Sequence, residues 1–313
     1  MAIEKQYIKA NTIEDAISEA ANNSGNFVFL AGGTDIFPNK FQENNLSDCL
    51  IDISNIDELK SINHSDDFLV IGALTTLDEL RKNDFIIQNF PTLIEAAISV
   101  GTPVIRKSAT LGGNLLCENR CHFYNQSAWW REAAGHCLKC GGDICLANGG
   151  KKYCYSKFVS DTAIALISLN AKIEIASKTK TEIIPIEEIY SGDGINHLKL
   201  DETSIIKSIQ IPLNKTVKSV YMKLRHRKSM EFSSLTTSVT LFKDEKIKIV
   251  LGAIAPNPII IEGKKGDNYQ DIIDIASKKS KIVFNDNYSR AYRKNMIHVF
   301  LNRCFVELQL IEN

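Results

Sequence analysis

The chain has 313 residues, of which 44% are hydrophobic and 24% are charged, and its formal net charge at pH 7 is zero. This composition is typical of a globular protein with two or three domains, and the balanced charge argues against binding to nucleic acid or an anionic membrane surface. No run approaches 18 consecutive apolar residues, and residues 1–6 lack the apolar core of a signal peptide. We therefore expect a cytoplasmic protein without a membrane span.

The beginning of the chain predicts a small α/β unit over about residues 1–57. A helix is predicted over residues 13–22, and a short apolar strand follows over residues 27–30. That strand leads directly into a glycine-rich turn, Ala31-Gly-Gly-Thr-Asp35. A second strand is predicted over residues 50–54, which completes the unit.

A second unit is predicted over about residues 58–199. It begins with a strand over residues 69–73 and contains an amphipathic helix over residues 92–99. An extended segment then leads into a second glycine-rich turn, Thr110-Leu-Gly-Gly-Asn114. After a cysteine-rich stretch, an apolar helix is predicted over residues 162–169.

From residue 200 the pattern changes to strands followed by helices. Four apolar runs predict consecutive strands over residues 205–212, 219–224, 235–241 and 247–254. Two helices are predicted near residues 271–279 and 289–310. This layout predicts an α+β C-terminal domain over residues 200–313.

Each of the two Gly-Gly turns is suited to an anionic cofactor. Backbone amides in such a turn can converge on a pyrophosphate, because no Cβ atom blocks the approach. Neither turn is a Walker loop, since no Gly-Lys-Ser/Thr follows, and neither contains the G-x-G-x-x-G dinucleotide fingerprint. An ordinary strand-to-helix turn is the alternative for either motif, and the two motifs together do not name a ligand.

Six of the eight cysteines lie within 38 residues, at positions 117, 121, 137, 140, 145 and 154. In a reduced protein this density indicates metal ligation or redox chemistry. Four thiolates suit a four-iron cluster, in which each iron takes one protein sulfur, whereas the C-x3-C and C-x2-C pairs alone would fit zinc. Both alternatives stay open at this point, as does a site without metal. Cys49 and Cys304 lie in apolar runs and are predicted to be buried.

Four motifs occur in the order found in FAD-binding medium subunits of the xanthine dehydrogenase (molybdenum hydroxylase) family. They are Ala31-Gly-Gly-Thr-Asp35, Thr110-Leu-Gly-Gly-Asn114, Ser160-Asp161 and Tyr221-Met-Lys223. The resemblance covers nearly the whole chain. It implies an α+β fold with a two-part FAD-binding domain of the vanillyl-alcohol-oxidase (PCMH) type over residues 1–199. A C-terminal α+β domain over residues 200–313 would resemble that of CO dehydrogenase flavoproteins.

The resemblance also implies which residues contact the cofactor. Two groups would wrap the FAD pyrophosphate and ribityl chain: Leu30, Ala31, Gly32, Gly33, Thr34 and Asp35, and Thr110, Leu111, Gly112, Gly113 and Asn114. Asp161 would accept a hydrogen bond from a cofactor hydroxyl, and Lys223 would lie by the flavin ring and stabilise its reduced anion. Val100 and Ile206 match positions that touch the cofactor. The residue types alone also allow a helix N-cap for Asp161, a solvent-facing strand position for Lys223, and plain core for Val100 and Ile206.

The cysteine-rich insert, at about residues 116–157, is similar to that of the 4-hydroxybenzoyl-CoA reductase β subunit. Matching pieces include Arg120-Cys121 and Trp129-Trp-Arg131. This similarity implies a [4Fe–4S] cluster on four ligands: Cys121, Cys137, Cys145 and Cys154. Cys140 or Cys117 could replace one of these ligands.

By this resemblance the chain is an electron-transfer subunit with no catalytic residue of its own. Its partners would be a large molybdopterin catalytic subunit and a small [2Fe–2S] subunit, in a dimer of heterotrimers. A ferredoxin-like donor would supply electrons through [4Fe–4S] and FAD to the partners, for reductive dehydroxylation of an aromatic CoA thioester. A flavin exchanges one or two electrons and can therefore join one-electron carriers to two-electron chemistry. The alternatives are the FAD subunit of a xanthine or N-heterocycle dehydrogenase and a zinc-stabilised, non-enzymatic binding module.

Overall fold

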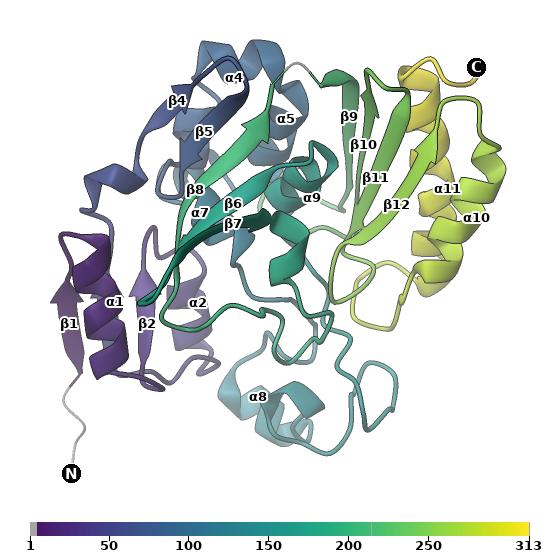
Figure 1. Ribbon diagram of the computed structural model, residues 1–313. Coiled ribbons are helices and arrows are strands. Elements are labelled where there is room, and N and C mark those ends of the chain that lie inside the picture. Colours follow the sequence, from purple (N-terminus) through teal and green to yellow (C-terminus); the bar gives the residue numbers. More distant parts are fainter. Residues whose placement is uncertain (1–4, 214, 313) are drawn as a thin grey trace.

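The computed structural model describes residues 5–213 and 215–312, which form three sheets that follow one another across the molecule (Figure 1). The first sheet lies at the left of Figure 1, the second in the middle, and the third at the right with the C-terminal helices. Residues 1–4, to which the signal-peptide argument partly refers, lie outside the described residues. Within the described residues, no helix has the length and apolar character needed to cross a membrane.

The first sheet contains the two predicted strands, β2 (Phe27–Leu30) and β3 (Cys49–Asp52), and a third strand, β1 (Gln6–Lys9). The strands run parallel in the order β1-β3-β2. The predicted first helix is α1 (Ile13–Asn22), and α2 (Ile36–Phe41) follows the first glycine-rich turn. Because the strands are parallel, that turn opens at the carboxyl edge of the sheet, where α/β proteins bind ligands.

The second sheet is antiparallel where its strands pair, in the order β4-β5-β8-β6-β7. Its strands are β4 (Ile62–His64), β5 (Phe68–Gly72), β6 (Lys172–Ala176), β7 (Thr181–Pro185) and β8 (Ile205–Pro212). The α-helices of this part are α3 (Leu77–Leu80), α4 (Asp84–Asn89), α5 (Pro91–Ser99), α6 (Pro103–Arg106), α7 (Leu111–Leu115) and α9 (Asp161–Ser168). Two 3-10 helices, η1 (Asp57–Leu59) and η3 (Ile186–Ile189), complete it. The largest buried cluster lies between this sheet and α5, α7 and α9.

The position of β8 corrects one expectation. Residues 205–212 are predicted as the first strand of the C-terminal domain, but β8 lies at the centre of the second sheet, between β5 and β6. A domain boundary at residue 200 would therefore divide this sheet. The apolar pattern of a strand identifies it as buried, but strand pairing is a long-range property that the pattern does not encode.

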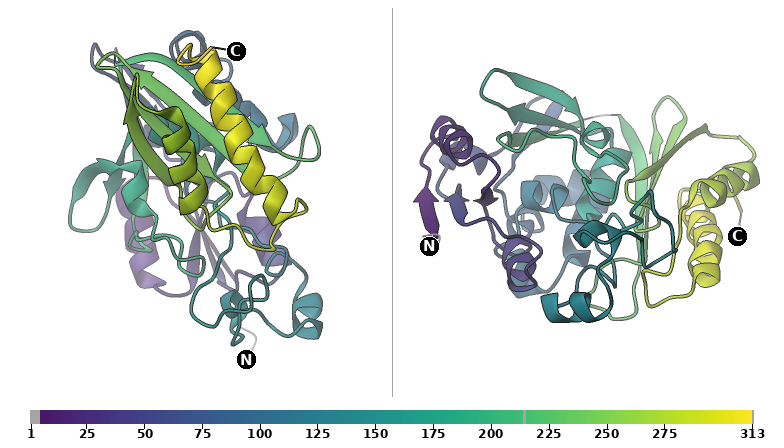
Figure 2. Two further views of the ribbon diagram at one scale, coloured as in Figure 1. Left: turned by 90° about the vertical axis from the view of Figure 1, so that its right-hand side faces the viewer. Right: turned by 90° about the horizontal axis from the view of Figure 1, so that it is seen from below.

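The third sheet contains β9 (Thr216–Leu224), β10 (Leu235–Phe242), β11 (Lys246–Gly252) and β12 (Ile259–Lys264), antiparallel in the order β12-β11-β10-β9. Two helices, α10 (Tyr269–Lys279) and α11 (Arg290–Glu307), lie across one face of it (Figure 2, left). The other face packs against α9 and α5 of the second part. A buried hydrogen bond joins these layers, because the hydroxyl oxygen of Ser168 on α9 lies 2.7 Å from the hydroxyl oxygen of Ser238 on β10.

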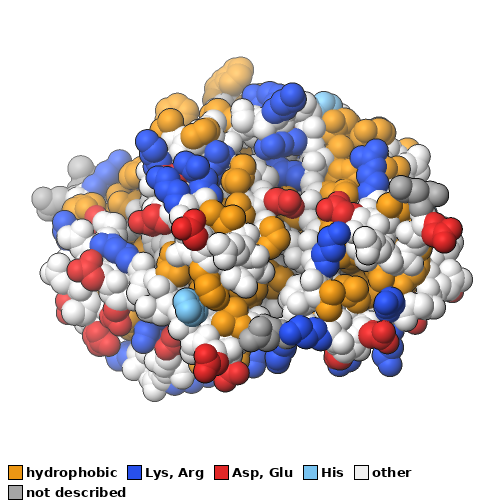
Figure 3. Space-filling model, turned by 90° about the horizontal axis from the view of Figure 1, so that it is seen from above, with side chains coloured by type: hydrophobic (Ala, Val, Ile, Leu, Met, Phe, Trp, Pro, Cys, Tyr) orange, Lys and Arg blue, Asp and Glu red, His pale blue; other side chains and the backbone are white. Residues whose placement is uncertain are grey.

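Residues 116–157 form what we call the cysteine lobe, at the bottom of Figure 1. Its regular structure is limited to α8 (Ala128–Ala133) and the 3-10 helix η2 (Leu138–Cys140). In the view from below, the lobe lies toward the viewer (Figure 2, right). The opposite face of the molecule carries basic and acidic side chains interspersed with hydrophobic ones (Figure 3), in keeping with the net charge of zero.

Candidate functional site

A cavity of about 660 Å³ lies where the three parts of the molecule meet. This volume is within the range of cofactor sites. Thirteen of the fifteen residues expected to contact a flavin nucleotide line it: Ala31, Gly32, Gly33, Thr34, Asp35, Val100, Thr110, Gly112, Gly113, Asn114, Asp161, Ile206 and Lys223. The two that do not line it are Leu30 and Leu111. Leu111 is fully buried in the core, and Leu30 ends β2.

The first glycine-rich turn presents its backbone to this cavity. Gly33 has a φ of +70°, a left-handed conformation that favours glycine. A Cβ atom on Gly32 would lie 1.8 Å from the carbonyl oxygen of Ser108, so this turn packs directly on the segment before the second turn. Within the described residues, the backbone N–H groups of Gly32, Gly33 and Thr34 donate no hydrogen bond. Consecutive amides of this kind form an anion-binding concavity.

The second glycine-rich turn differs, because the amides of its residues 111–114 are already paired. It is the start of α7, where Thr110 is the N-cap and accepts a hydrogen bond from Gly113 N at 3.1 Å. Leu111 N donates to the Thr75 carbonyl and Gly112 N donates to the Ala73 carbonyl, each at 2.8 Å. Asn114 accepts from the Thr162 hydroxyl at 2.6 Å, which ties α7 to α9. The second turn therefore shapes the wall of the cavity, and its residues 111–114 do not offer free amides.

Asp161 and Lys223 form a buried ion pair of 2.6 Å at another part of the wall. Both side chains are only 5% exposed. The Asp161 carboxylate also accepts from the hydroxyls of Tyr221 at 3.0 Å and Ser233 at 2.6 Å. Burial, reinforced by the Asp161 charge, raises the pKa of Tyr221 well above its usual value and keeps it a donor.

The alternatives considered for these two residues are wrong. Ser160, not Asp161, is the side chain that caps α9, because its hydroxyl accepts from Ala163 N at 3.2 Å. Lys223 does not face water. Val100 is half-buried and Ile206 is buried, and both line the cavity as well as the core.

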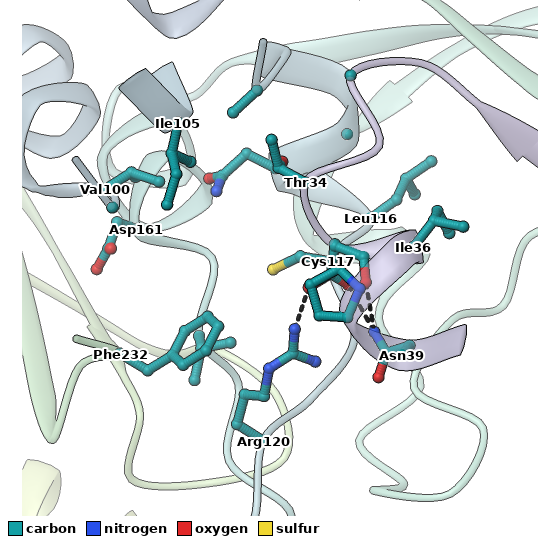
Figure 4. Close-up of a pocket in the computed structure, with 18 of the residues that line it drawn as sticks. Thr34, Ile36, Asn39, Val100, Ile105, Leu116, Cys117, Arg120, Asp161 and Phe232 are labelled. Atoms are coloured by element: carbon teal, nitrogen blue, oxygen red, sulfur yellow. Dashed lines mark hydrogen bonds and ion pairs between the residues drawn. The ribbon is translucent and has the colours of Figure 1, made fainter. Parts of the chain in front are cut away.

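Several residues that line the cavity were not expected there from the sequence (Figure 4). Cys117, Arg120 and Phe232 lie on the same cavity as Thr34 and Asp161. Arg120 pairs with Asp35, and its guanidinium lies 4.6 Å from the centre of the Phe232 ring. Burial raises the pKa of the Cys117 thiol far above its usual value, so the thiol is neutral. The only sequence signal for Arg120 was its place beside Cys121.

The four expected metal ligands lie together in the cysteine lobe. They are Cys121, Cys137, Cys145 and Cys154, with exposures of 8%, 6%, 5% and 6%. All four line a second, small cavity of about 10 Å³, with Phe123 and Tyr124 among their neighbours. Every cysteine of the chain is a free thiol. Cys121 lines both cavities, so the two sites share a wall.

The remaining two cysteines of the lobe are placed differently. Cys140 Sγ lies 3.4 Å from Cys137 Sγ, whereas Cys117 lies on the large cavity. Burial raises the pKa of Cys121 to about 12, and also raises the pKa of Cys137 and Cys154. Among the described residues, no three His, Cys, Asp or Glu side chains converge in the way that holds a single metal ion.

Comparison with known proteins identifies the family. The profile of the family described as "FAD binding domain in molybdopterin dehydrogenase" matches residues 2–214. The chain belongs to this family. The match extends through β8, in agreement with the place of that strand in the second sheet.

The relatives of this chain include the xanthine dehydrogenase FAD-binding subunit of Escherichia coli O157:H7. It is 27% identical over 258 residues, which cover 81% of this chain and 75% of the relative. The glyceraldehyde dehydrogenase medium chain of Sulfolobus acidocaldarius is 22% identical over 319 aligned positions, which cover 97% and 98%. A chain of carbon monoxide dehydrogenase from Hydrogenophaga pseudoflava has a similar fold, with a TM-score of 0.75 at 18% identity over 97% of both chains.

These findings confirm the predicted fold class and the predicted family. The chain is an FAD-binding oxidoreductase subunit of the molybdenum hydroxylase type. The narrower similarity of its insert to one reductase, the metal in the lobe and the residues that touch the flavin remain predictions.

Proposed function

We propose that FAD occupies the large cavity with its pyrophosphate on the first glycine-rich turn. The unpaired amides of Gly32, Gly33 and Thr34 supply the donors that a pyrophosphate requires. The second turn contributes the shape of the wall. The first turn would therefore bind the pyrophosphate through its amides, and the second turn would line the cavity without donating to it.

The Asp161–Lys223 pair would face the flavin ring and its hydroxyl-bearing side chain. One oxygen of Asp161 already accepts from Tyr221 and Ser233, whereas the other accepts only from Lys223. A carboxylate has about four acceptor positions, so Asp161 can take one further hydrogen bond from a cofactor hydroxyl. Lys223 also donates to the Ser99 carbonyl at 3.0 Å, which fixes its charge at the wall. Bound FAD supplies one- and two-electron chemistry.

We propose that the cysteine lobe holds a [4Fe–4S] cluster on Cys121, Cys137, Cys145 and Cys154. The donor set fits the cluster, because four buried thiols surround one cavity and each iron requires one thiolate. The buried Lys139 ammonium, paired with Glu118 at 2.6 Å, supplies a positive charge next to these sulfurs. The observation that carries the proposal is the shared wall at Cys121, which suits transfer of electrons between two adjacent centres.

The complex that fits these features best is a reductase of the 4-hydroxybenzoyl-CoA reductase kind. Electrons from a ferredoxin-like donor would enter through the lobe and leave through FAD to a small [2Fe–2S] subunit and a large molybdopterin subunit. The proposed assembly is a cytoplasmic dimer of heterotrimers. The second candidate is a purine dehydrogenase, which the similarity to the xanthine dehydrogenase subunit favours.

A set of cysteine variants tests the cluster. Cys121→Ser, Cys137→Ser, Cys145→Ser and Cys154→Ser should each lose iron, measured together with zinc on anaerobically purified protein. Cys49→Ser and Cys304→Ser are matched controls, because both residues are buried thiols outside the two cavities, and they should retain iron. If Cys145→Ser keeps its full iron content, the ligand assignment is wrong. If Cys140→Ser loses iron and Cys137→Ser does not, Cys140 is the ligand.

Assays of the purified complex separate the two candidate reactions. Reduced ferredoxin or viologen is offered with an aromatic CoA thioester in one arm, and a purine with an acceptor dye in the other. We expect turnover in the first arm. Turnover only with the purine would assign the complex to the second candidate.

A further inference from the structure

The two ends of the cysteine lobe pair with each other at what we call the neck. Further hydrogen bonds also join the lobe to the rest of the molecule, among them those from Phe284 N to the Ala147 carbonyl and from Lys139 Nζ to the Gly194 carbonyl. Arg120 and Lys157 form an isolated antiparallel bridge, in which each backbone N–H donates to the other residue's carbonyl, at 2.9 and 2.8 Å. Both residues line the large cavity, and so does the neighbouring Cys121. Any rearrangement of the lobe that moves this neck therefore moves the cavity wall.

The Arg120 side of the neck holds the first glycine-rich turn. Its guanidinium pairs with Asp35, the last residue of that turn. The second oxygen of Asp35 accepts from the backbone N–H of Glu118, at 3.1 Å. Asp35 stands at the N-cap position of α2 but makes no capping hydrogen bond there. Asn39 of α2 also donates to the Asp35 carboxylate at 3.3 Å and to the Asp35 carbonyl at 2.9 Å. The end of the first turn is therefore held by the lobe as well as by its own helix.

The Lys157 side of the neck is fixed to the C-terminal part. Lys157 pairs with Asp286 and donates to the Ser233 carbonyl at 2.9 Å. The side chains of Lys157 and Asp286 are 8% and 2% exposed, whereas Asp35 is 26% exposed. Of the two ion pairs at the neck, the Arg120–Asp35 pair is the one with access to solvent and the freedom to separate.

The rest of the lobe has little regular structure to hold it in place. Apart from α8 and η2, it consists of loops around four buried thiols. Metal binding to such a segment stabilises its folded form, because the ligands are not assembled without the metal. Loss of the metal should therefore loosen the lobe up to the neck.

We infer that Arg120 is a positioning residue that couples the metal content of the lobe to the affinity of the chain for FAD. Iron in the lobe holds the neck, Arg120 then holds Asp35, and the first turn keeps the shape that receives the pyrophosphate. Because coupling between two binding sites is reciprocal, bound FAD also raises the affinity of the lobe for iron. This inference rests on the proposed FAD and [4Fe–4S] sites.

The test measures the FAD dissociation constant of flavin-free protein in two states, with the iron–sulfur cluster loaded and after removal of iron by a chelator. In wild-type protein we expect the iron-free state to bind FAD about tenfold more weakly, within the usual range of coupling between sites. In Arg120→Gln the ratio of the two constants should fall to about 1. Arg120→Lys keeps the charge and should restore part of the ratio.

Lys248→Gln is the matched control. The Lys248–Glu187 pair has the same side-chain exposures as the Arg120–Asp35 pair, 8% and 26%, but neither residue lines either cavity. This variant should keep the wild-type ratio. A direct contact between Arg120 and FAD, without coupling, would change both constants equally and leave the ratio intact in Arg120→Gln.

The outcomes are distinguishable. If wild-type protein takes up iron and sulfide but binds FAD equally well in both states, the inference is overturned and the proposed function stands. A full wild-type ratio in Arg120→Gln also overturns it. If iron is not taken up at all, the cluster proposal fails and this inference fails with it.

Discussion

The large cavity and the cysteine lobe share a wall but are built by different means. The cavity is formed by turns at the ends of strands and helices, whose backbone positions are fixed by three packed sheets. The lobe is formed by loops around four thiols, with only two short helices of its own. The first site should thus exist before its cofactor binds, whereas the second should depend on its metal.

The largest expected effect comes from the neck, which belongs to both regions. Asp286→Asn leaves Lys157 buried and unpaired, and removal of one partner of a buried ion pair costs about 3–5 kcal/mol. The measurement is the free energy of unfolding in urea. Asp244→Asn is the control, because its pair with Lys246 is exposed, and it should leave stability unchanged. A small effect of Asp286→Asn would mean that the Lys157–Asp286 pair does not fix the neck to the C-terminal part.

The same pair predicts the response to acid. Burial alone would raise the pKa of Asp286, but the attraction and hydrogen bond of Lys157, with help from Arg293, hold that pKa below its usual value. Because the pKa is lower in the folded state, the stabilisation is present above about pH 4 and is lost as the pH falls through the folded-state value. Asp286→Asn should remove this part of the acid dependence, as measured by urea unfolding between pH 3 and 7.

Removal of iron should make the cysteine lobe more sensitive to protease and leave the rest of the molecule unchanged. Lys151 and Lys152 are exposed in the lobe, and Lys178 and Lys180 are exposed in the turn between β6 and β7. After chelation, trypsin should cut at the lobe sites about 100-fold faster, since a loss of roughly 3 kcal/mol of local stability raises the open population by that factor. Cleavage at Lys178 and Lys180 should not change. Equal acceleration at both places would show that the lobe is not a separate, metal-dependent unit.

A substitution in the first turn should damage the cavity without touching the lobe. In Gly32→Ala the new methyl group would meet the Ser108 carbonyl, so the turn must shift, at a cost of about 1–3 kcal/mol. The purified protein should contain little FAD but a full complement of iron. Gly25→Ala is the control for a glycine change away from the cavity. Gly25 has a positive φ, which Gly32 does not, so an alanine there is strained, but no heavy atom lies within 4 Å of its Cβ position, and the protein should retain FAD.

An effect of similar size is expected from a single hydroxyl in the cavity wall. Tyr221→Phe removes one donor to the Asp161 carboxylate, and a hydrogen bond to a charged group contributes about 1.5–3 kcal/mol. FAD affinity should fall together with stability. Tyr190→Phe also removes a buried hydroxyl, which donates to the Leu115 carbonyl at 3.0 Å, but it should leave FAD affinity unchanged. Equal FAD affinities in the two variants would place the Asp161 carboxylate away from the cofactor.

What the sequence predicted well depends on local pattern. The strands β2 and β5, the helix α1 and the two glycine-rich turns follow from apolar periodicity and from glycine content within a few residues. The four buried thiols could be grouped because cysteine is rare and its clustering is visible in the chain. Each of these features can be recognised without knowledge of what lies opposite it in the fold.

What the sequence did not predict depends on contacts between distant segments. The place of β8, the pairing of Asp161 with Lys223 and the pairing of Arg120 with Asp35 each join residues 29 or more positions apart. Single basic residues such as Arg120 have no local pattern that marks their role. The second turn also looked like the first, although the fold pairs its amides with residues 73–75.

The central claim is that one chain holds FAD and a four-iron cluster on two sides of a shared wall. The most direct test is the content of FAD, iron and acid-labile sulfide in anaerobically isolated wild-type protein. A [4Fe–4S] cluster beside FAD predicts about four iron and four sulfide for each FAD. Protein that contains FAD with no iron, or with one zinc in place of the cluster, would contradict the claim.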